Sequence, residues 1–454
     1  MKLSSPRLRG ALVVLAAFLV LAALAGPGLL RPGRDNHFVH MAAGWLDGRL
    51  ALVGEPPGYP KRHDDWGRVW TLTLRDGGTL RGYPCVTAVC EQRRRQGVET
   101  WFRGGGERVE LRRSDIVGRA SRWYVTFPPG PALVMLPFVA IWGLGFLDVL
   151  FTALAAALIP AVLVRLLERV RPGHLREHLW AAAAWTVASP ACFVGAHGSV
   201  WFTAQVLGAL FLALHLDAAW DARQPARAGL WLGLAAACRV TVGFAALFFV
   251  LEWWRGGRRL ADLLRFLGPL ALIGAAMAAL NWLRFADPFE FGHRYLDIRW
   301  QTRIQTFGMF SPHYLWRNLQ CMLWLAPQLV AGAPSLRWSI HGMGLLVGSP
   351  WLLLLLRARQ RFPQRAGLAL AAAAVAVPDL LYQNSGQVQF SYRFALDFLP
   401  LLLVLLVVGG GARGRWFPAL VVLAAALQLY GAWMFARDPG HLFVRDPWWP
   451  FAPE

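Results

Sequence analysis

The stretch DNHFVHMAAGWLDGRL, residues 35–50, directly follows the first hydrophobic segment of the chain, residues 10–30. Its apolar residues recur at helical spacing, and it is too polar overall to cross a bilayer, so it predicts a helix lying on the membrane surface. Asp35 stands at the N-terminal end of this helix, where a carboxylate serves either as a cap or as a catalytic group. The apolar face would hold Phe38, Met41, Ala42, Trp45 and Leu46.

The composition indicates the class of protein. Of 454 residues, 56% are hydrophobic and only 16% are charged, and the mean hydropathy is +0.40. Apolar runs recur along most of the chain, which is typical of a polytopic membrane protein rather than a soluble one. The net charge of +20 is spread over short loops. It therefore indicates loop topology and contact with anionic lipid, and we expect no nucleic-acid partner.

The lengths of the apolar runs and the positions of the arginines predict a topology. Residues 132–144 are too few to cross, since about 13 residues give about 20 Å of helix against a hydrocarbon core of about 30 Å. With that run at the outer surface, the arginines between Arg165 and Arg176 are cytoplasmic, as the positive-inside rule requires. Residues 230–251 carry Arg239 in their middle and should form two short segments that meet there. We expect an all-α polytopic membrane protein with about 11 transmembrane helices.

This topology predicts how the chain is divided. In the first loop, residues 69–81 and 99–111 have the turn residues and the alternation of two β-hairpins. Cys85 and Cys90 lie between them, where a disulfide is permitted but the spacing does not decide it, and no second Cys or His pair completes a zinc pattern.

The expected parts are a first transmembrane helix (1–30), a long external loop with interfacial helices and a small β insertion (31–145), a transmembrane core (146–284), an external region with an interfacial helix (285–342), C-terminal transmembrane helices (343–434) and an external tail (435–454).

Polar residues that persist at the predicted outer face are the candidates for chemistry, together with Arg239, whose charge within the membrane is costly unless it is paired. Each has a structural explanation as well. Asp35 could cap its helix, the histidines could be solvated, and Arg239 could belong to an internal ion pair. The arginines near the surface could reach lipid head groups. The outer-face candidates are Asp35, His37, His40, His197, Glu290, His293, Arg294, Asp297, Gln387, Tyr392 and Arg393.

One acid, several arginines and a membrane setting suit a lipid-linked anionic substrate, because an acid can take a proton and arginines can hold phosphate. The order of features also resembles the GT-C class of polyprenyl-phosphate-sugar glycosyltransferases, near its protein-mannosyltransferase and aminoarabinose-transferase branch. The segments that carry the resemblance are DNHFVHMAAGWLDGRL (35–50), YVTFPPGPALVMLP (124–137), ARAGLWLGLAAACRVTVG (226–243), NWLRFADPFEFGHRY (281–295) and QFSYRFALDFLP (389–400).

The resemblance implies an integral membrane glycosyltransferase of the cell envelope. It would move a sugar from a polyprenyl-phosphate donor to a hydroxyl of an unidentified acceptor, with inversion, at the external face of a bacterial inner membrane. In that class the first external loop supplies an acid that acts as a base or a metal ligand, and Asp35 holds that position. Asn36 stands where a second acid is common, and His197 and Ser199 stand near the place of an acid in the second external loop. These departures leave the use of a divalent metal, and activity itself, open.

We expect Asp35 to be the catalytic base. The expected donor-phosphate ligands are Arg239, Arg294 and Arg393, and the further site residues are His37, His40, His197, Glu290, Asp297 and Tyr392. Two other functions remain. Broken helices and an intramembrane Arg239 would also suit a transporter or flippase of an anionic lipid. The external β insertion would also suit a non-catalytic membrane scaffold that binds a partner.

Overall fold

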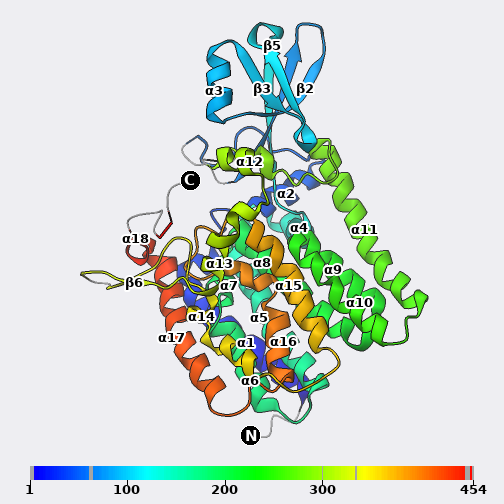
Figure 1. Ribbon diagram of the computed structural model, residues 1–454, viewed down its shortest axis with the longest axis vertical. Coiled ribbons are helices and arrows are strands. Elements are labelled where there is room, and N and C mark those ends of the chain that lie inside the picture. The colour runs from blue at the N-terminus through cyan, green and yellow to red at the C-terminus, as the bar shows by residue number, and fades with distance from the viewer. Residues whose placement is uncertain (1–4, 61–64, 299, 333–334, 445–449, 452–454) are drawn as a thin grey trace. The chain divides into compact units, whose positions relative to one another are not determined.

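The computed structural model describes residues 5–60, 65–298, 300–332, 335–444 and 450–451 (Figure 1). Its contacts divide the chain into two compact units. The helical unit comprises Met1–Arg34, Leu147–Ala271 and Pro312–Glu454, and the sheet unit comprises Asp35–Phe146 and Leu272–Ser311. The predicted division of the chain into six parts remains a prediction, and most of residues 445–454, in the expected external tail, lies outside the described residues.

Among the residues that the structure describes, five helical segments are long and apolar enough to cross a membrane, which confirms a polytopic, mostly helical membrane protein. The expected number of crossings remains a prediction. The segments are α1 (Pro6–Ala25) with η1 (Gly26–Leu30), α5 (Asp148–Val170), α8 (Val200–Ala219) with η5 (Trp220–Ala222), α11 (Leu260–Phe285) and α17 (Trp416–Arg437).

Several other apolar runs form short, broken helices. The structure confirms the break at Arg239, since α9 (Pro225–Cys238) ends there and η6 (Val240–Ala245) and α10 (Ala246–Arg255) follow. Breaks at Ser-Pro pairs separate α6 (Leu175–Val187) from α7 (Ala191–Gly195) and α14 (Leu345–Gly348) from η9 (Pro350–Arg357). The freed carbonyl of Ala188 accepts hydrogen bonds from Ser349 Oγ at 2.9 Å and Trp351 Nε1 at 2.8 Å, so side chains at the second break satisfy the carbonyl freed at the first.

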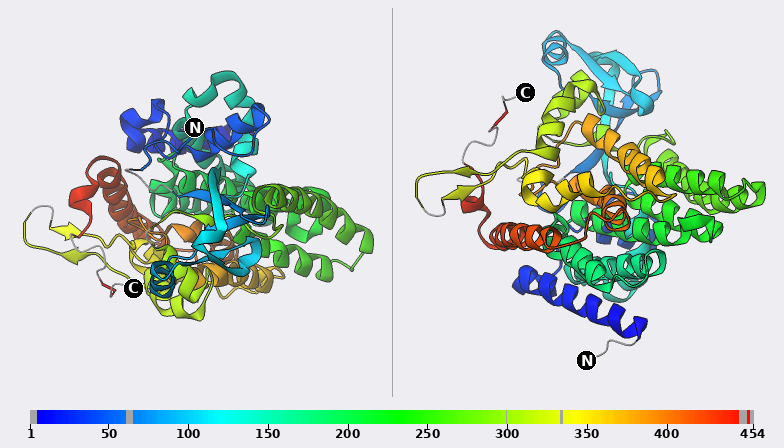
Figure 2. Two further views of the ribbon diagram at one scale, coloured as in Figure 1. Left: turned by 90° about the horizontal axis from the view of Figure 1, so that it is seen from above. Right: turned by 60° about the horizontal axis from the view of Figure 1, so that its bottom comes forward.

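Within the helical unit, α8 is enclosed on nearly all sides. It packs against α5 and α9, and α5 also packs against α1. In Figure 2, α1 is the blue helix beside the N-terminus. Gly208 of α8 makes room for the stem of Arg239, because a Cβ there would lie 3.1 Å from Arg239 Cγ. The remaining elements of the unit are α13 (Leu315–Leu323), β6 (Gln328–Leu329), β7 (Leu336–Arg337), α15 (Arg365–Leu381), η10 (Arg393–Asp397), α16 (Leu399–Val408) and α18 (Pro439–Leu442), with η8 (Pro312–Tyr314).

The sheet unit contains a five-stranded antiparallel sheet in the order β4-β3-β2-β1-β5. Both predicted hairpins are confirmed, as β1 (Trp66–Leu74) with β2 (Thr79–Pro84) and β3 (Val98–Phe102) with β4 (Arg108–Arg112). The sequence did not predict β5 (Ile116–Val125), which pairs with β1 and is largely exposed over its first half. It also did not predict α3 (Ala88–Arg95), and the open question of Cys85 and Cys90 is settled by a disulfide between them.

Two helices of the sheet unit were expected and are present. The first, α2 (His37–Leu46), has Asn36 as its N-cap residue, and Asp35 lies one residue before it. The second, α4 (Gly130–Trp142), has 13 residues and is followed by η4 (Gly143–Gly145).

One face of the sheet packs Val69, Tyr83 and Tyr124 against Phe285 and Tyr295. This packing ties the last residue of α11 and the segment after it to the sheet. The remaining short elements are η2 (Gly104–Gly106), η3 (Arg113–Asp115), η7 (His293–Tyr295) and α12 (Gln301–Phe307).

Candidate functional site

The chain that leads from α1 to Asp35 is held firmly in the helical unit. Asp148, the first residue of α5, accepts a hydrogen bond from Gly33 N at 2.5 Å and is 2% exposed. A Cβ at Gly33 would lie 2.5 Å from the carbonyl oxygen of Gly198, and a Cβ at Gly198 would lie 2.5 Å from Val149 N. Three backbone segments therefore meet with no room for side chains, and the chain is fixed two residues before Asp35.

Asp148 is a buried acid that the sequence analysis missed. It lies two residues into an apolar run at the start of the predicted transmembrane core, and an acid at the start of such a run is a signal of a buried pair or a site. The end of α1 has a further anchor at α17, since Arg437 donates to the carbonyl oxygens of Leu24 at 2.9 Å and Ala23 at 3.2 Å. These contacts order the carbonyl end of the first transmembrane helix.

His197 lies at the same junction, in the loop between α7 and α8. Its ring meets Phe202 and Phe435 edge-on, with centroid separations of 5.8 Å and 5.0 Å. The neighbouring Gly198 is the residue against which Gly33 packs. The structure therefore places this candidate beside the chain that leads to Asp35.

Arg239 is paired within the helical unit. Its Nη2 lies 2.6 Å from Asp397 Oδ2 and 3.7 Å from Asp379 Oδ1, and Thr241 also donates to Asp397 at 3.1 Å. Both carboxylates are buried. The ion-pair explanation of Arg239 is therefore confirmed. The sequence analysis missed both acids, although each is a lone acid in an apolar run, which is the signal that singled out Arg239.

Arg393 and Tyr392 are also buried in the helical unit. Arg393 Nε donates to the carbonyl oxygen of Gly386 at 2.9 Å and Nη1 to Gln205 Oε1 at 3.1 Å, and the side chain is not directed to the surface. Its guanidinium carbon lies 4.9 Å from the ring centre of Phe394. Tyr392 is fully buried, and its hydroxyl has no hydrogen-bond partner among the described residues. Arg393 is thus a cation that the structure keeps away from solvent.

In the sheet unit, two aromatic residues join the helix after Asp35 to the segment around Arg294. His37 stacks on Trp66 with a centroid separation of 3.9 Å, and His40 meets the same ring edge-on at 5.8 Å. The explanation of these histidines as solvated side chains is therefore wrong for His37, which is 1% exposed, and burial lowers the pKa of His40.

The same two aromatic residues reach the other segment. The carbonyl oxygen of Trp66 accepts a hydrogen bond from Asp297 N at 3.4 Å. Phe127 meets His37 edge-on at 6.0 Å and His293 edge-on at 5.8 Å. Candidates far apart in sequence, in residues 37–40 and 293–297, thus lie around one aromatic pair.

Glu290 and Arg294 form a pair of unequal exposure. Glu290 is 4% exposed, accepts a hydrogen bond from Gly292 N at 2.6 Å, and lies 3.6 Å from Arg294 Nε. Burial raises the pKa of Glu290 above its ordinary value, against the opposing effects of Gly292 and Arg294. The side chain of Arg294 is 38% exposed. Asp297 lies apart from this pair, with Oδ2 at 4.0 Å from Arg68 Nη1.

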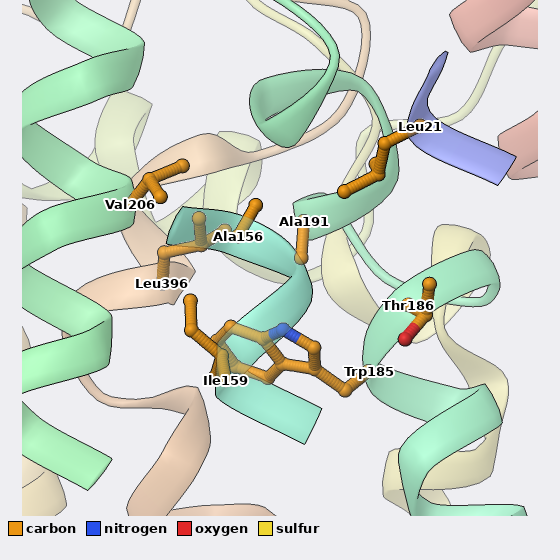
Figure 3. Close-up of a pocket in the computed structure, with 8 residues that line it drawn as sticks. All are labelled: Leu21, Ala156, Ile159, Trp185, Thr186, Ala191, Val206 and Leu396. Carbon is orange, nitrogen blue, oxygen red and sulfur yellow. The ribbon is translucent and has the colours of Figure 1, made fainter. Parts of the chain in front are cut away.

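The helical unit also contains an apolar pocket, drawn in Figure 3, between α1, α5, α6, α7, α8 and η10. Its space is close to the ~10–15 Å³ that a single water molecule needs, so it is a gap in packing rather than a substrate site. Within the described residues, no group of three or more His, Cys, Asp or Glu side chains could hold a metal ion. The pocket is lined by Leu21, Ala156, Ile159, Trp185, Thr186, Ala191, Val206 and Leu396.

Comparisons with known proteins identify the family. No curated protein and no solved structure matches the chain significantly. The sequence model of Glycosyltransferase family 87 matches residues 125–382, which is more than half of the chain and includes Asp148, His197, Arg239 and Arg294. The chain therefore belongs to Glycosyltransferase family 87, a family of the GT-C fold, and is a membrane glycosyltransferase.

Proposed function

We propose that the protein moves a sugar from a polyprenyl-phosphate donor to an acceptor hydroxyl at the outer face of the membrane, with inversion. The observation that carries this proposal is the arrangement in the sheet unit. Trp66 and Phe127 connect the helix that follows Asp35 with the segment that holds the half-exposed Arg294. An acid that can take a proton and a cation that can hold a phosphate are the two groups that such a transfer needs.

In the proposed reaction Asp35 takes the proton of the acceptor hydroxyl. The oxygen attacks the anomeric carbon from the side opposite the phosphate, and the bond between that carbon and the phosphate oxygen breaks. The electron pair of that bond leaves with the polyprenyl phosphate, whose negative charge a guanidinium stabilises. Atoms and charges balance, since the acceptor loses one proton, the base gains it, and the sugar changes partners.

Of the three arginines proposed to bind the donor phosphate, Arg294 has the strongest support. Its side chain is half-exposed, and its nearest carboxylate, Glu290, is 3.6 Å away. Arg239 already has its charge compensated by two buried carboxylates. Arg393 is buried and donates to a carbonyl oxygen and an amide oxygen. A phosphate would have to displace these partners, so we assign Arg239 and Arg393 a lesser part in donor binding.

The disulfide and the arginine-rich loops support an external site. A disulfide between Cys85 and Cys90 is typical of an oxidising compartment, which the sheet of the first long loop would meet outside the cytoplasm. The arginines between Arg165 and Arg176 follow α5, and the positive-inside rule favours a cytoplasmic place for them. We therefore propose a bacterial inner membrane protein of the cell envelope, acting on its external side.

The test of this function is donor turnover. The purified protein would be placed in lipid nanodiscs with a labelled polyprenyl-phosphate sugar and an alkyl glycoside as acceptor. We expect release of free polyprenyl phosphate and a glycosylated product with the opposite anomeric configuration. A flippase or a scaffold would leave the donor intact, so an unchanged donor with correctly folded protein would overturn the proposal. Parallel assays with and without a chelator show whether a divalent metal takes part.

A further inference from the structure

Three arginine side chains of the helical unit converge on one acid, Asp217 of α8. Arg165 Nη2 lies 2.7 Å from Asp217 Oδ2, and Arg169 Nη2 lies 2.8 Å from Oδ1. Arg223, which follows η5, has its Nη2 at 3.9 Å from the same Oδ1. One carboxylate offsets one of the three positive charges, so this arginine cluster (Arg165, Arg169 and Arg223) keeps a positive charge that attracts a further anion.

The members of the arginine cluster differ in how much of their binding capacity is used. Arg169 donates to Asp217 Oδ1 at 2.8 Å and to the carbonyl oxygen of Asp217 at 2.7 Å, so it joins α5 to the end of α8. Arg165 donates to Asp217 Oδ2, and its side chain is 62% exposed. The side chain of Arg223 is 45% exposed, and its separation of 3.9 Å is too long for a hydrogen bond. Because a guanidinium group carries several N–H donors, Arg165 and Arg223 keep donors for a ligand.

The dipole of α5 and the nearby Glu168 account for only part of the arginine cluster. The dipole favours a cation in the last turn of the helix, where Arg169 lies. Arg165 lies before that turn, where the effect of the dipole has fallen off. Glu168 is paired with Arg9 at 2.9 Å, so it does not offset the charge of the cluster. The exposed charge of Arg165 therefore remains for a partner.

The surface of α5 that leads to the arginine cluster is apolar. Leu154 and Leu158 are 46% and 44% exposed. At about 100° per residue, both lie within about 60° of Arg165 and Arg169 around the helix. From Leu154 to Arg165 the helix rises about 16 Å, which is close to half of a hydrocarbon core of about 30 Å. An exposed apolar stripe with the depth of one lipid layer therefore ends at exposed guanidinium groups.

We propose that Arg165 and Arg223 bind the phosphate diester of an anionic phospholipid, whose acyl chains lie along the apolar stripe of α5. Guanidinium groups suit phosphate oxygens, and the positive charge of the cluster favours an anionic lipid over a zwitterionic one. Arg169 acts as a positioning residue, because it holds Asp217 against α5. The apolar stripe selects a lipid over a soluble phosphate. This lipid site lies within the helical unit and is independent of the proposed sugar transfer.

The test measures lipid binding directly. The purified protein would be titrated in detergent with dioleoyl phosphatidylglycerol or dioleoyl phosphatidylcholine, and bound lipid would be counted by native mass spectrometry. The double variant Arg165→Gln with Arg223→Gln removes both exposed charges and keeps Arg169 on Asp217. Each arginine near an anionic lipid favours binding about fivefold, so this variant should bind phosphatidylglycerol about 20-fold more weakly than the wild type. Its affinity for phosphatidylcholine should change much less.

A matched control separates the lipid site from the general positive charge of the loops. Arg359→Gln with Arg361→Gln removes the same charge from exposed arginines of the same unit, in the loop between η9 and α15. This control variant should bind phosphatidylglycerol like the wild type. Glycerol phosphate carries the head-group charge without acyl chains, so it should compete only weakly with phosphatidylglycerol.

The fold of the test variant is checked by its Tm in detergent. Both substituted side chains are substantially exposed, so the Tm should stay that of the wild type. If the Tm falls, the single variant Arg165→Gln replaces the double variant, and it should bind phosphatidylglycerol about fivefold more weakly.

Three results would overturn the lipid site. Binding of phosphatidylglycerol at the wild-type affinity in the test variant would remove Arg165 and Arg223 from it. Equal loss of binding in the test and control variants would show that net charge alone attracts the lipid. Displacement of phosphatidylglycerol by glycerol phosphate at a similar concentration would assign the cluster to a soluble phosphate. The measurement uses no sugar donor or acceptor, so its result is separate from that of the proposed function.

Discussion

Arg239 and Arg294 are both arginines that a phosphate could use, and their surroundings differ. In the helical unit, Arg239 lies 2.6 Å from one buried carboxylate and 3.7 Å from another. In the sheet unit, Arg294 is half-exposed and has one carboxylate at 3.6 Å. A charge within an apolar bundle is costly, so the fold supplies its counter-charges. Arg239, the arginine that stands out in the sequence, is therefore held by two buried carboxylates, while Arg294 keeps part of its side chain exposed.

The largest effect is expected from Arg239→Ala. It leaves Asp379 and Asp397 buried without their cation, which should lower the free energy of unfolding by about 3–5 kcal/mol. Unfolding in mild detergent, followed by circular dichroism, measures the loss. The double variant Arg239→Ala with Asp397→Asn removes one of the stranded charges and should regain part of the stability. Wild-type stability in Arg239→Ala would show that the cluster does not hold the bundle.

A smaller, kinetic effect is expected from Arg294→Lys. Lysine keeps the positive charge but loses the planar fork that holds two phosphate oxygens, so the KM for the donor should rise about tenfold. The unfolding temperature should stay that of the wild type, because the side chain is half-exposed and its ion pair is loose. If instead the Tm falls and the KM is unchanged, Arg294 belongs with Arg239 as a structural cation.

The smallest effect concerns Glu290, the partner of Arg294. Burial raises the pKa of Glu290, so the folded state holds the proton more tightly than the unfolded state. The resulting stability is complete below the unfolded pKa of about 4.3 and is lost as the pH rises through the folded value. Glu290→Gln keeps an oxygen for Gly292 and cannot ionise. Its Tm should therefore gain on that of the wild type as the pH rises from about 4.3.

Parallel Tm curves for the wild type and Glu290→Gln would show that Arg294 fully offsets the burial of Glu290. If the Tm of Glu290→Gln instead gained on that of the wild type as the pH falls, the ion pair with Arg294 would outweigh the burial of Glu290. Arg294 would then be a structural cation like Arg239. Asp297→Asn is a matched control, because this acid lies in the same segment, 4.0 Å from Arg68 and partly exposed. Because the side chain is partly exposed, this substitution should change the Tm less than Glu290→Gln does.

The sequence predicted the features that depend on local pattern. The break at Arg239 followed from one charge in a long apolar run, and the hairpins followed from Asp76-Gly77-Gly78 and the glycines at 104–106. Such features require only the periodicity and turn preferences of neighbouring residues.

The missed features depend on long-range contacts. Asp397 lies 158 residues from Arg239 in sequence, and Asp148 lies 115 residues from Gly33. Their pairing follows from packing that no local pattern records. The β5 strand was missed for a similar reason, because it is half exposed at the sheet edge and lacks the alternation that marks a buried strand. The sequence therefore identified the candidate residues but not the residues that contact them in the fold.

The substitution Asp35→Asn tests most directly whether the first long loop carries the catalytic base. Asn36 is the N-cap residue of α2, so an amide at position 35 should leave the helix and the Tm unchanged. An amide cannot take the proton of the acceptor, and loss of a base typically costs ~100- to 10,000-fold in rate. Release of polyprenyl phosphate from labelled donor should therefore nearly cease in a protein that inserts and melts like the wild type. Release at the wild-type rate would contradict the account.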